Sequence, residues 1–402
     1  MDGVPDISNA PIPPRQMYVY EYPILQTGTY WYHSHVGFQE QVGLYGPFII
    51  EPRDEPLQVE HDAVVMLGDW LHRSPQQVFD ELRGAPGGDA GASSGTPGGM
   101  PGMKEMPGMD GAKGMPSAAP QASPAMAGMA MGGKPKGGGA DLSDVKYDAF
   151  LQNGKAENDP WTLAAKPGEK IRLRIINAGA STYFRVALDG HPLQVTHADG
   201  LAVEPVSVDH LLMGMAETYD VVVALEKPGS HTLHAVAQDG SGQAIGVLHT
   251  PGVEPKPNRE MPPFTGRALE SAALRAPSST VLPPGPARRF RLPLQGDMAK
   301  YVWMIDGQAW PKADPLVIRR GDRVELELIN QTMMWHPMHL HGHFFRVLQG
   351  AGDFAPLKHT VNVPPGETVR IEVTADNPGR WFFHRHNAYH LEAGMARELV
   401  YE

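Results

Sequence analysis

The sequence lacks cysteine altogether. Disulfide scaffolds, zinc-thiolate sites, iron–sulfur clusters and thiol nucleophiles are therefore excluded. Long hydrophobic runs are also missing, because no segment approaches the ~18 consecutive apolar residues that a membrane-spanning helix needs. Basic residues are fewer than acidic ones, 34 against 45, and the net charge of −11 disfavours a nucleic-acid groove. The 18 His and 20 Met residues have to carry any metal chemistry.

Hydrophobic periodicity predicts an all-β protein. Residues 170–175 and 323–328 alternate polar and apolar side chains, as half-buried antiparallel strands do, and turn residues separate such segments. Almost no stretch has the 3.6-residue period of an amphipathic helix. At ~150 residues per domain, the chain predicts two or three domains, built as β-sandwiches or barrels with Greek-key connections.

An internal repeat indicates related domains near the two ends of the chain. Residues 15–51 align with residues 366–402 at a constant offset and without a gap. The equivalent positions include Gly28 and Gly379, Trp31 and Phe382, His33 and His384, His35 and His386, and Gly43 and Gly394. A weaker third copy relates residues 168–177 to residues 321–330. Three related β domains are therefore predicted.

The repeat and the composition set the expected boundaries. Residues 1–55 are expected to form the C-terminal half of a first, incomplete domain, and residues 56–255 a second domain. Residues 256–280 are expected to be a linker and residues 281–402 a third domain. Residues 84–140 are rich in Gly, Pro and Met and contain no aromatic residue. Because such a segment cannot bury a core, we expect a disordered insert within the second domain.

Three His-x-His pairs are the main chemical signal. They are His33 and His35, His339 and His341, and His384 and His386. On a strand, residues i and i+2 point to the same face about 7 Å apart, so one pair can serve two neighbouring metal ions. Imidazole suits copper, zinc, iron and nickel. A single pair is also compatible with a polar strand face, but three pairs, two of them at equivalent repeat positions, favour metal binding.

A second metal site is indicated around the last pair. His336 precedes His339 by three residues and would point to the opposite face of an extended chain. His390 and Met395 follow His386 closely. A blue-copper centre needs two His, one Cys thiolate and a weak axial Met. The thiolate is expected at position 385, where this sequence has Arg385, whose guanidinium cannot bind copper.

These motifs resemble those of the multicopper oxidases, and more narrowly those of bacterial copper-resistance oxidases with Met-rich inserts. The resemblance covers nearly the whole chain and depends on residues 29–35, 216–221, 336–343 and 384–395. It implies three cupredoxin-like (plastocyanin-like) Greek-key domains, with a type 1 copper in the third and a trinuclear copper cluster between the first and third. Family members pass electrons from the type 1 site through its Cys to the cluster, where dioxygen is reduced to water.

The resemblance also implies a ligand set. The type 3 copper pair would be bound by His33, His35, His341, His384 and His386, the type 2 copper by His339, and the type 1 copper by His336, His390 and Met395. The family's first His-x-His-Gly motif normally lies just before a segment like residues 2–5, so we expect one type 2 and one type 3 ligand outside this chain.

The expected function is copper tolerance by oxidation of Cu(I) or phenolic donors. Arg385 leaves the electron path without its thiolate, so we expect enzymatic turnover by this chain to be impaired. The alternatives are a copper-binding or sequestering protein without turnover, and an inactive remnant. The family works in the periplasm, although residues 1–5 contain no basic or apolar segment of a secretory signal.

The insert adds a predicted binding segment for Cu(I). Met100, Met103, Met106 and Met109 recur every third residue, and in a polyproline II conformation they would line one edge. Thioethers prefer Cu(I), so the insert is predicted to capture cuprous ions. The alternative is a low-complexity linker. The histidines outside the motifs, including His343 and His359, are expected to be structural or to lie at the surface.

Overall fold

The computed structural model describes residues 2–84 and 143–402, and it confirms the predicted all-β class. Strands dominate these residues, and the two α-helices among them are short: α1 (Pro75–Leu82) and α2 (Ala388–Glu392). Two 3-10 turns cover Ser271–Ala273 and Gly352–Phe354. Neither α-helix is long enough or apolar enough to cross a bilayer.

The N-terminal part of the chain forms a two-stranded antiparallel sheet. Strand β1 (Gly28–His33) pairs with β2 (Tyr45–Ile50), so that Gly28 lies opposite Ile50 and His33 opposite Tyr45. Gly28 has a φ of 140° and passes very close to Gly200, whose carbonyl oxygen would lie 2.1 Å from an added Cβ. Only glycine allows this close approach of the two backbones.

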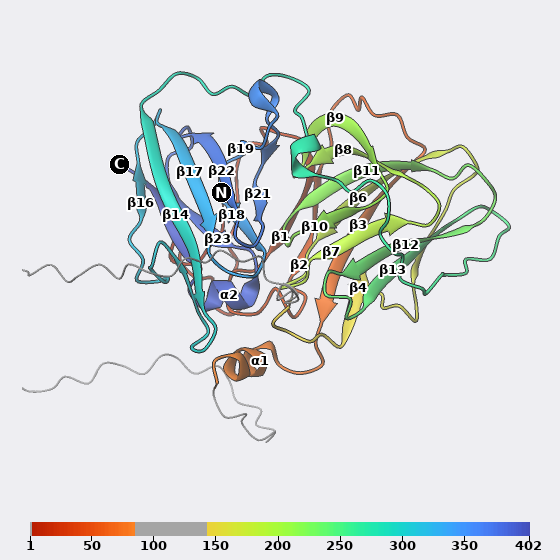
Figure 1. Ribbon diagram of the computed structural model, residues 1–402, viewed down its shortest axis with the longest axis horizontal. Helices are drawn as coiled ribbons and strands as arrows, with labels where there is room; N and C mark the ends of the chain where they lie inside the picture. The colour runs from red at the N-terminus through yellow and green to blue at the C-terminus, as the bar shows by residue number, and fades with distance from the viewer. Residues whose placement is uncertain (1, 85–142) are drawn as a thin grey trace, which may run out of the picture. The chain divides into compact units, whose positions relative to one another are not determined.

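The middle of the chain forms two sheets, in which Figure 1 draws β3 in orange and the other strands from yellow to green. The strand order is β10-β7-β12-β13-β5 in the five-stranded sheet and β4-β3-β6-β11-β8-β9 in the six-stranded sheet. The strands are β3 (His61–Trp70), β4 (Ala149–Gln152), β5 (Trp161–Ala164), β6 (Lys170–Asn177), β7 (Phe184–Leu188), β8 (Leu193–Ala198), β9 (Leu201–Val208), β10 (Leu211–Met213), β11 (Thr218–Ala224), β12 (Ser230–Ala237) and β13 (Gln243–His249).

The C-terminal part forms two further sheets, in green-blue to blue in Figure 1. Their orders are β15-β14-β17-β22-β19-β20 and β16-β24-β23-β18-β21. The strands are β14 (Ala287–Asp297), β15 (Val302–Ile305), β16 (Leu316–Ile318), β17 (Arg323–Asn330), β18 (His336–Leu340), β19 (Phe345–Val347), β20 (Leu357–Lys358), β21 (Thr360–Val363), β22 (Thr368–Thr374), β23 (Arg380–Arg385) and β24 (Ala396–Tyr401).

The two segments used to predict strands differ in burial. Strand β17 alternates between buried and half-buried residues, as predicted. Strand β6 was predicted to be half-buried, but all its residues after Lys170 are buried, including Arg172 and Arg174. The reason is tertiary: β1 and the segment around Glu55 cover the face of β6 that carries the two arginines.

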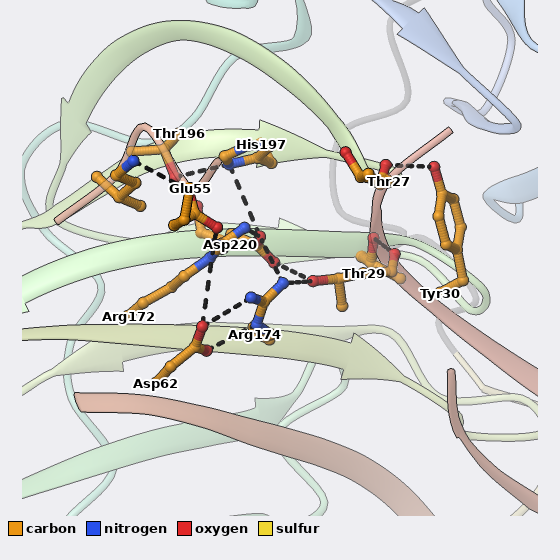
Figure 2. A network of polar contacts seen from close by, with 12 residues as sticks. Thr27, Thr29, Tyr30, Glu55, Asp62, Arg172, Arg174, Thr196, His197 and Asp220 are labelled. Carbon is orange, nitrogen blue, oxygen red and sulfur yellow. Dashed lines mark hydrogen bonds and ion pairs between the residues drawn. The ribbon is translucent and has the colours of Figure 1, made fainter. Parts of the chain in front are cut away.

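The covered arginines form a polar network between β1 and the middle sheets, which Figure 2 shows. Thr29 Oγ1 donates to Asp220 Oδ1 at 2.7 Å and accepts from Arg174 at 3.1 Å. The second carboxylate oxygen of Asp220 accepts from Arg172 Nε at 3.0 Å. Arg174 also makes two bonds to Asp62, at 2.6 and 2.7 Å. These contacts anchor β1 four residues before His33.

The predicted domain boundaries remain a prediction. Strands β1 and β2 lie within residues 1–55, the middle sheets use strands from residue 61 to residue 249, and the C-terminal sheets use strands from residue 287 to residue 401. Most of the predicted insert, residues 84–140, lies outside the described residues. The predicted Cu(I) ligands Met100, Met103, Met106 and Met109 are among those not described.

Candidate metal centre

Six of the predicted ligands converge at the place where β1 meets the C-terminal sheets. Strand β18 lies beside β23 in antiparallel register, so that His339 is directly opposite His384. The end of β1 brings the first His pair to the same place, and ring contacts join all the rings into one group. We call this group the histidine cluster: His33, His35, His339, His341, His384 and His386.

Three imidazoles of the histidine cluster form a compact set. The ring nitrogens of His35, His341 and His384 lie within 4.8 Å of one another. The Nε2 atoms of His341 and His384 are only 3.0 Å apart, and the buried Nε2 of His35 has no hydrogen-bonding partner among the described residues. Imidazole nitrogens that face one another in this way can all bind one metal ion, and imidazole is a good copper ligand.

A second set joins His33 and His386, whose Nε2 atoms are 3.2 Å apart. Glu40, from the loop between β1 and β2, completes this set, with Oε2 at 2.8 Å from His33 Nδ1. Sequence reasoning missed Glu40. No spacing rule distinguishes it from its neighbours Gln39 and Gln41, which are equally close to the first His pair in the chain.

The orientation of His339 is fixed from outside the histidine cluster. Its Nδ1 lies 2.8 Å from the carbonyl oxygen of His359 and donates to it, which leaves Nε2 free for a metal. The backbone N–H groups of His359 and Thr360 in turn donate to Asp199, at 3.1 and 3.0 Å. Lys358 lies 3.1 Å from the same carboxylate. A residue of the middle sheets thus supports the histidine cluster.

Four rings of the histidine cluster are held neutral by their surroundings. Burial, reinforced by neighbouring imidazoles, lowers the pKa of His35, His339, His384 and His386 well below the usual value. The Nδ1 atom of His341 contacts the carboxylate of Asp2, and the Nε2 atom of the same ring faces His384. Neutral imidazole is the form that binds metals, so the donor set of the histidine cluster fits copper.

These pKa shifts predict acid sensitivity in the metal-free protein. The lowered pKa values of the folded state mean that the unfolded chain takes up protons which the buried rings do not. The free energy of unfolding is unaffected above about pH 6.5. Below that pH it falls, by up to about 1.4 kcal/mol per pH unit for each such ring. Urea unfolding across this range should therefore show a falling midpoint below about pH 6.5. His384→Gln should flatten this dependence, and a midpoint independent of pH would contradict the prediction.

The remaining predicted ligands surround Arg385, in what we call the Arg385 pocket: His336, Arg385, His390 and Met395. The Arg385 side chain is 2% exposed, and burial lowers its pKa to about 10. Its guanidinium contacts His390 Nδ1, donates to the carbonyl oxygen of Trp335 at 2.8 Å and lies over the ring of Trp303. The backbone N–H of Arg385 donates to the backbone carbonyl oxygen of Met395 at 3.1 Å, and Met395 is fully buried.

Both ring nitrogens of His390 are already engaged. Nδ1 contacts the guanidinium, and Nε2 contacts the carboxylate of Asp144, which also accepts from Tyr301 at 2.8 Å. His336 keeps one nitrogen without a partner among the described residues. With the cationic Arg385 side chain between these donors, the Arg385 pocket does not fit a copper ion. The structure therefore brings the predicted type 1 residues together but fills their centre.

The family models with the description "Multicopper oxidase" match residues 1–55, 61–252 and 283–402. Multicopper oxidase MmcO of Mycobacterium tuberculosis is 37% identical over 406 residues, which cover 100% of this chain and 74% of that protein. Copper resistance protein A of Escherichia coli is 32% identical over 511 residues, which cover 100% of this chain and 82% of that protein.

Solved structures show the same fold. A laccase from Botrytis aclada has a TM-score of 0.70 at 22% identity, over 99% of this chain and 74% of that one. Fet3p, described as a multicopper oxidase that functions in iron import, has a TM-score of 0.70 at 18% identity, over 94% of this chain and 73% of that one. The predicted cupredoxin-like fold is thereby confirmed. The chain belongs to the multicopper oxidase family.

Proposed function

We propose that the protein serves copper tolerance as a copper-dependent oxidoreductase, with its copper held in the histidine cluster. The observation that carries this proposal is the convergence of six neutral or carboxylate-backed imidazoles, with Nε2 atoms facing one another at 3.0 and 3.2 Å. Relatives named copper resistance protein A support the biological role.

The ligand assignment follows the geometry of the histidine cluster. His35, His341 and His384 would hold one copper ion, His33 and His386 a second, and His339 a third. Copper bound there would supply the redox chemistry by which the family reduces dioxygen to water. The chain's own contribution is to present neutral imidazoles in fixed tautomers, with His339 held by the carbonyl group of His359.

A second candidate function is copper sequestration without turnover. It is favoured by Arg385, because the guanidinium occupies the position through which electrons from Cu(I) or a phenolic donor would enter. The histidine cluster would then store copper without being reduced through the Arg385 pocket. An inactive remnant, the third possibility, would bind copper at neither place.

Copper binding separates these possibilities. We expect the metal-free protein to bind copper in competition with a chelator, and His384→Ala to weaken this binding at least ~10-fold, the loss that even an outer-shell change causes. His210→Ala, which removes an imidazole from outside the histidine cluster, is the matched control. Oxygen uptake with Cu(I) or a phenol then distinguishes oxidase from sequestering protein. Absence of copper binding in the unaltered protein would refute both.

Two finer proposals concern location and copper capture. We place the protein in the periplasm, where copper is not held by cytosolic thiols. We assign Cu(I) capture to Met100, Met103, Met106 and Met109, since thioethers prefer the cuprous ion. These methionines lie outside the described residues, so their sequence spacing alone supports this assignment, and a low-complexity linker is the alternative.

A further inference from the structure

Among the described residues, Glu40 is the one carboxylate placed between two imidazoles of the histidine cluster that come from opposite ends of the chain. The residue is 6% exposed. Oε2 lies 2.8 Å from Nδ1 of His33, and Oε1 lies 3.9 Å from Nδ1 of His386. The same two rings face each other through their Nε2 atoms, which are 3.2 Å apart. Each ring therefore has the carboxylate behind it and the other imidazole in front.

This arrangement has a chemical consequence. A neutral imidazole keeps its proton on one nitrogen and binds a metal through the other, and an acceptor behind the ring decides which nitrogen is protonated. Apart from the contact of 2.8 Å between Glu40 Oε2 and His33 Nδ1, neither His33 Nδ1 nor Glu40 Oε1, both buried, has a polar partner at hydrogen-bonding distance among the described residues. The carboxylate is thus placed to accept the Nδ1 proton of His33 at 2.8 Å and to attract that of His386 by its charge from 3.9 Å.

The neighbours of Glu40 have other contacts. Gln39 is exposed and accepts a hydrogen bond from Ser34 at 2.7 Å. Gln41 is buried but turns toward the middle sheets, where its amide donates to the backbone and side chain of Asp69, both at 3.1 Å. In this stretch of the loop, Glu40 alone faces the histidine cluster.

We propose that Glu40 is a positioning residue that fixes the Nδ1–H tautomer of His33 and His386 and thereby presents both Nε2 atoms to one copper ion. The inference deepens the proposed function and rests on it for the metal, but the tautomer itself is a property of the metal-free chain. The negative charge of the Glu40 carboxylate would also offset part of the charge of a bound cation. One carboxylate would in this way align ligands from β1 and from the end of β23.

The test is Glu40→Gln, which keeps the shape of the side chain but replaces one oxygen with an NH₂ group. An Nδ1–H that faces this group would place a donor against a donor. Nitrogen-15 NMR of histidine-labelled, metal-free protein should show at least one of His33 and His386 shifting toward the Nε2–H tautomer. Copper competition should show a 10- to 100-fold weaker site, while the copper at His35, His341 and His384 is retained. Glu40→Asp should restore part of the difference.

Glu51→Gln, which changes an exposed acid just after β2, is the matched control and should alter neither measurement. Thermal unfolding of the metal-free variants, with Glu40→Ala as a second substitution, separates a change of tautomer from a loss of fold. Unchanged tautomers in folded Glu40→Gln would overturn the inference, even if copper were lost, because Glu40 would then be a direct ligand. If Glu40→Gln shifted the tautomers but the unaltered protein bound no copper, the proposed function would be refuted. The role of Glu40 in the metal-free protein would still hold.

Discussion

Replacement of Arg385 with Cys is expected to turn the copper-loaded protein blue. His336, His390 and Met395 already surround position 385. The substitution removes the guanidinium from His390 Nδ1 and supplies the thiolate that completes a two-His, one-Cys, one-Met donor set. Visible absorption should therefore gain an intense thiolate-to-copper band that the unaltered protein lacks, and copper per chain should rise by one.

Arg385→Ser is the control for this substitution. It empties the Arg385 pocket to a similar extent but offers no thiolate, so the blue band should be absent. Oxygen uptake with Cu(I), measured on the same three proteins, distinguishes the two candidate functions: turnover confined to Arg385→Cys favours sequestration by the natural chain. A colourless Cys variant that holds copper in the histidine cluster would refute the type 1 assignment of these residues.

The second large effect is expected at Asp220, at the centre of the network in Figure 2. Its carboxylate is 1% exposed and accepts from Thr29 and Arg172. Asp220→Asn would leave two buried guanidiniums without their central counter-charge, and breaking a buried ion pair from one side costs about 3–5 kcal/mol. We expect about 3 kcal/mol, the lower end, because Glu55 and Asp62 remain as partners. Urea unfolding measures this loss.

The exposed pair of Arg275 and Glu204 provides the contrast. Its side chains are 41% and 51% exposed, and solvent screens such pairs, so Glu204→Gln should change the free energy of unfolding by less than about 1 kcal/mol. Asp220→Asn should also weaken copper binding, since Thr29 anchors the strand that ends at His33. A loss of stability as small as that of the Glu204 variant would show that the network does not hold β1.

The features that depend on local pattern could be predicted from the order of residues alone. Alternation of side chains across a strand has a fixed period of two, so the strand at residues 323–328 and the all-β class could be predicted. The His-x-His pairs were recognisable for the same reason, because residues i and i+2 share a face. The resemblance to the multicopper oxidases then implied that the first and last His pairs share one copper cluster, and the rings of His33 and His386 do face each other.

The tertiary structure decided what covers a strand and what lies behind each ligand. Residues 170–175 look half-buried in sequence, yet β1 and the segment around Glu55 bury Arg172 and Arg174. Glu40 behind His33 and His386, and the carbonyl group of His359 behind His339, were invisible to spacing arguments. The physical reason is that periodicity specifies only the direction of a side chain from its own strand. The partner it meets there depends on how distant segments pack.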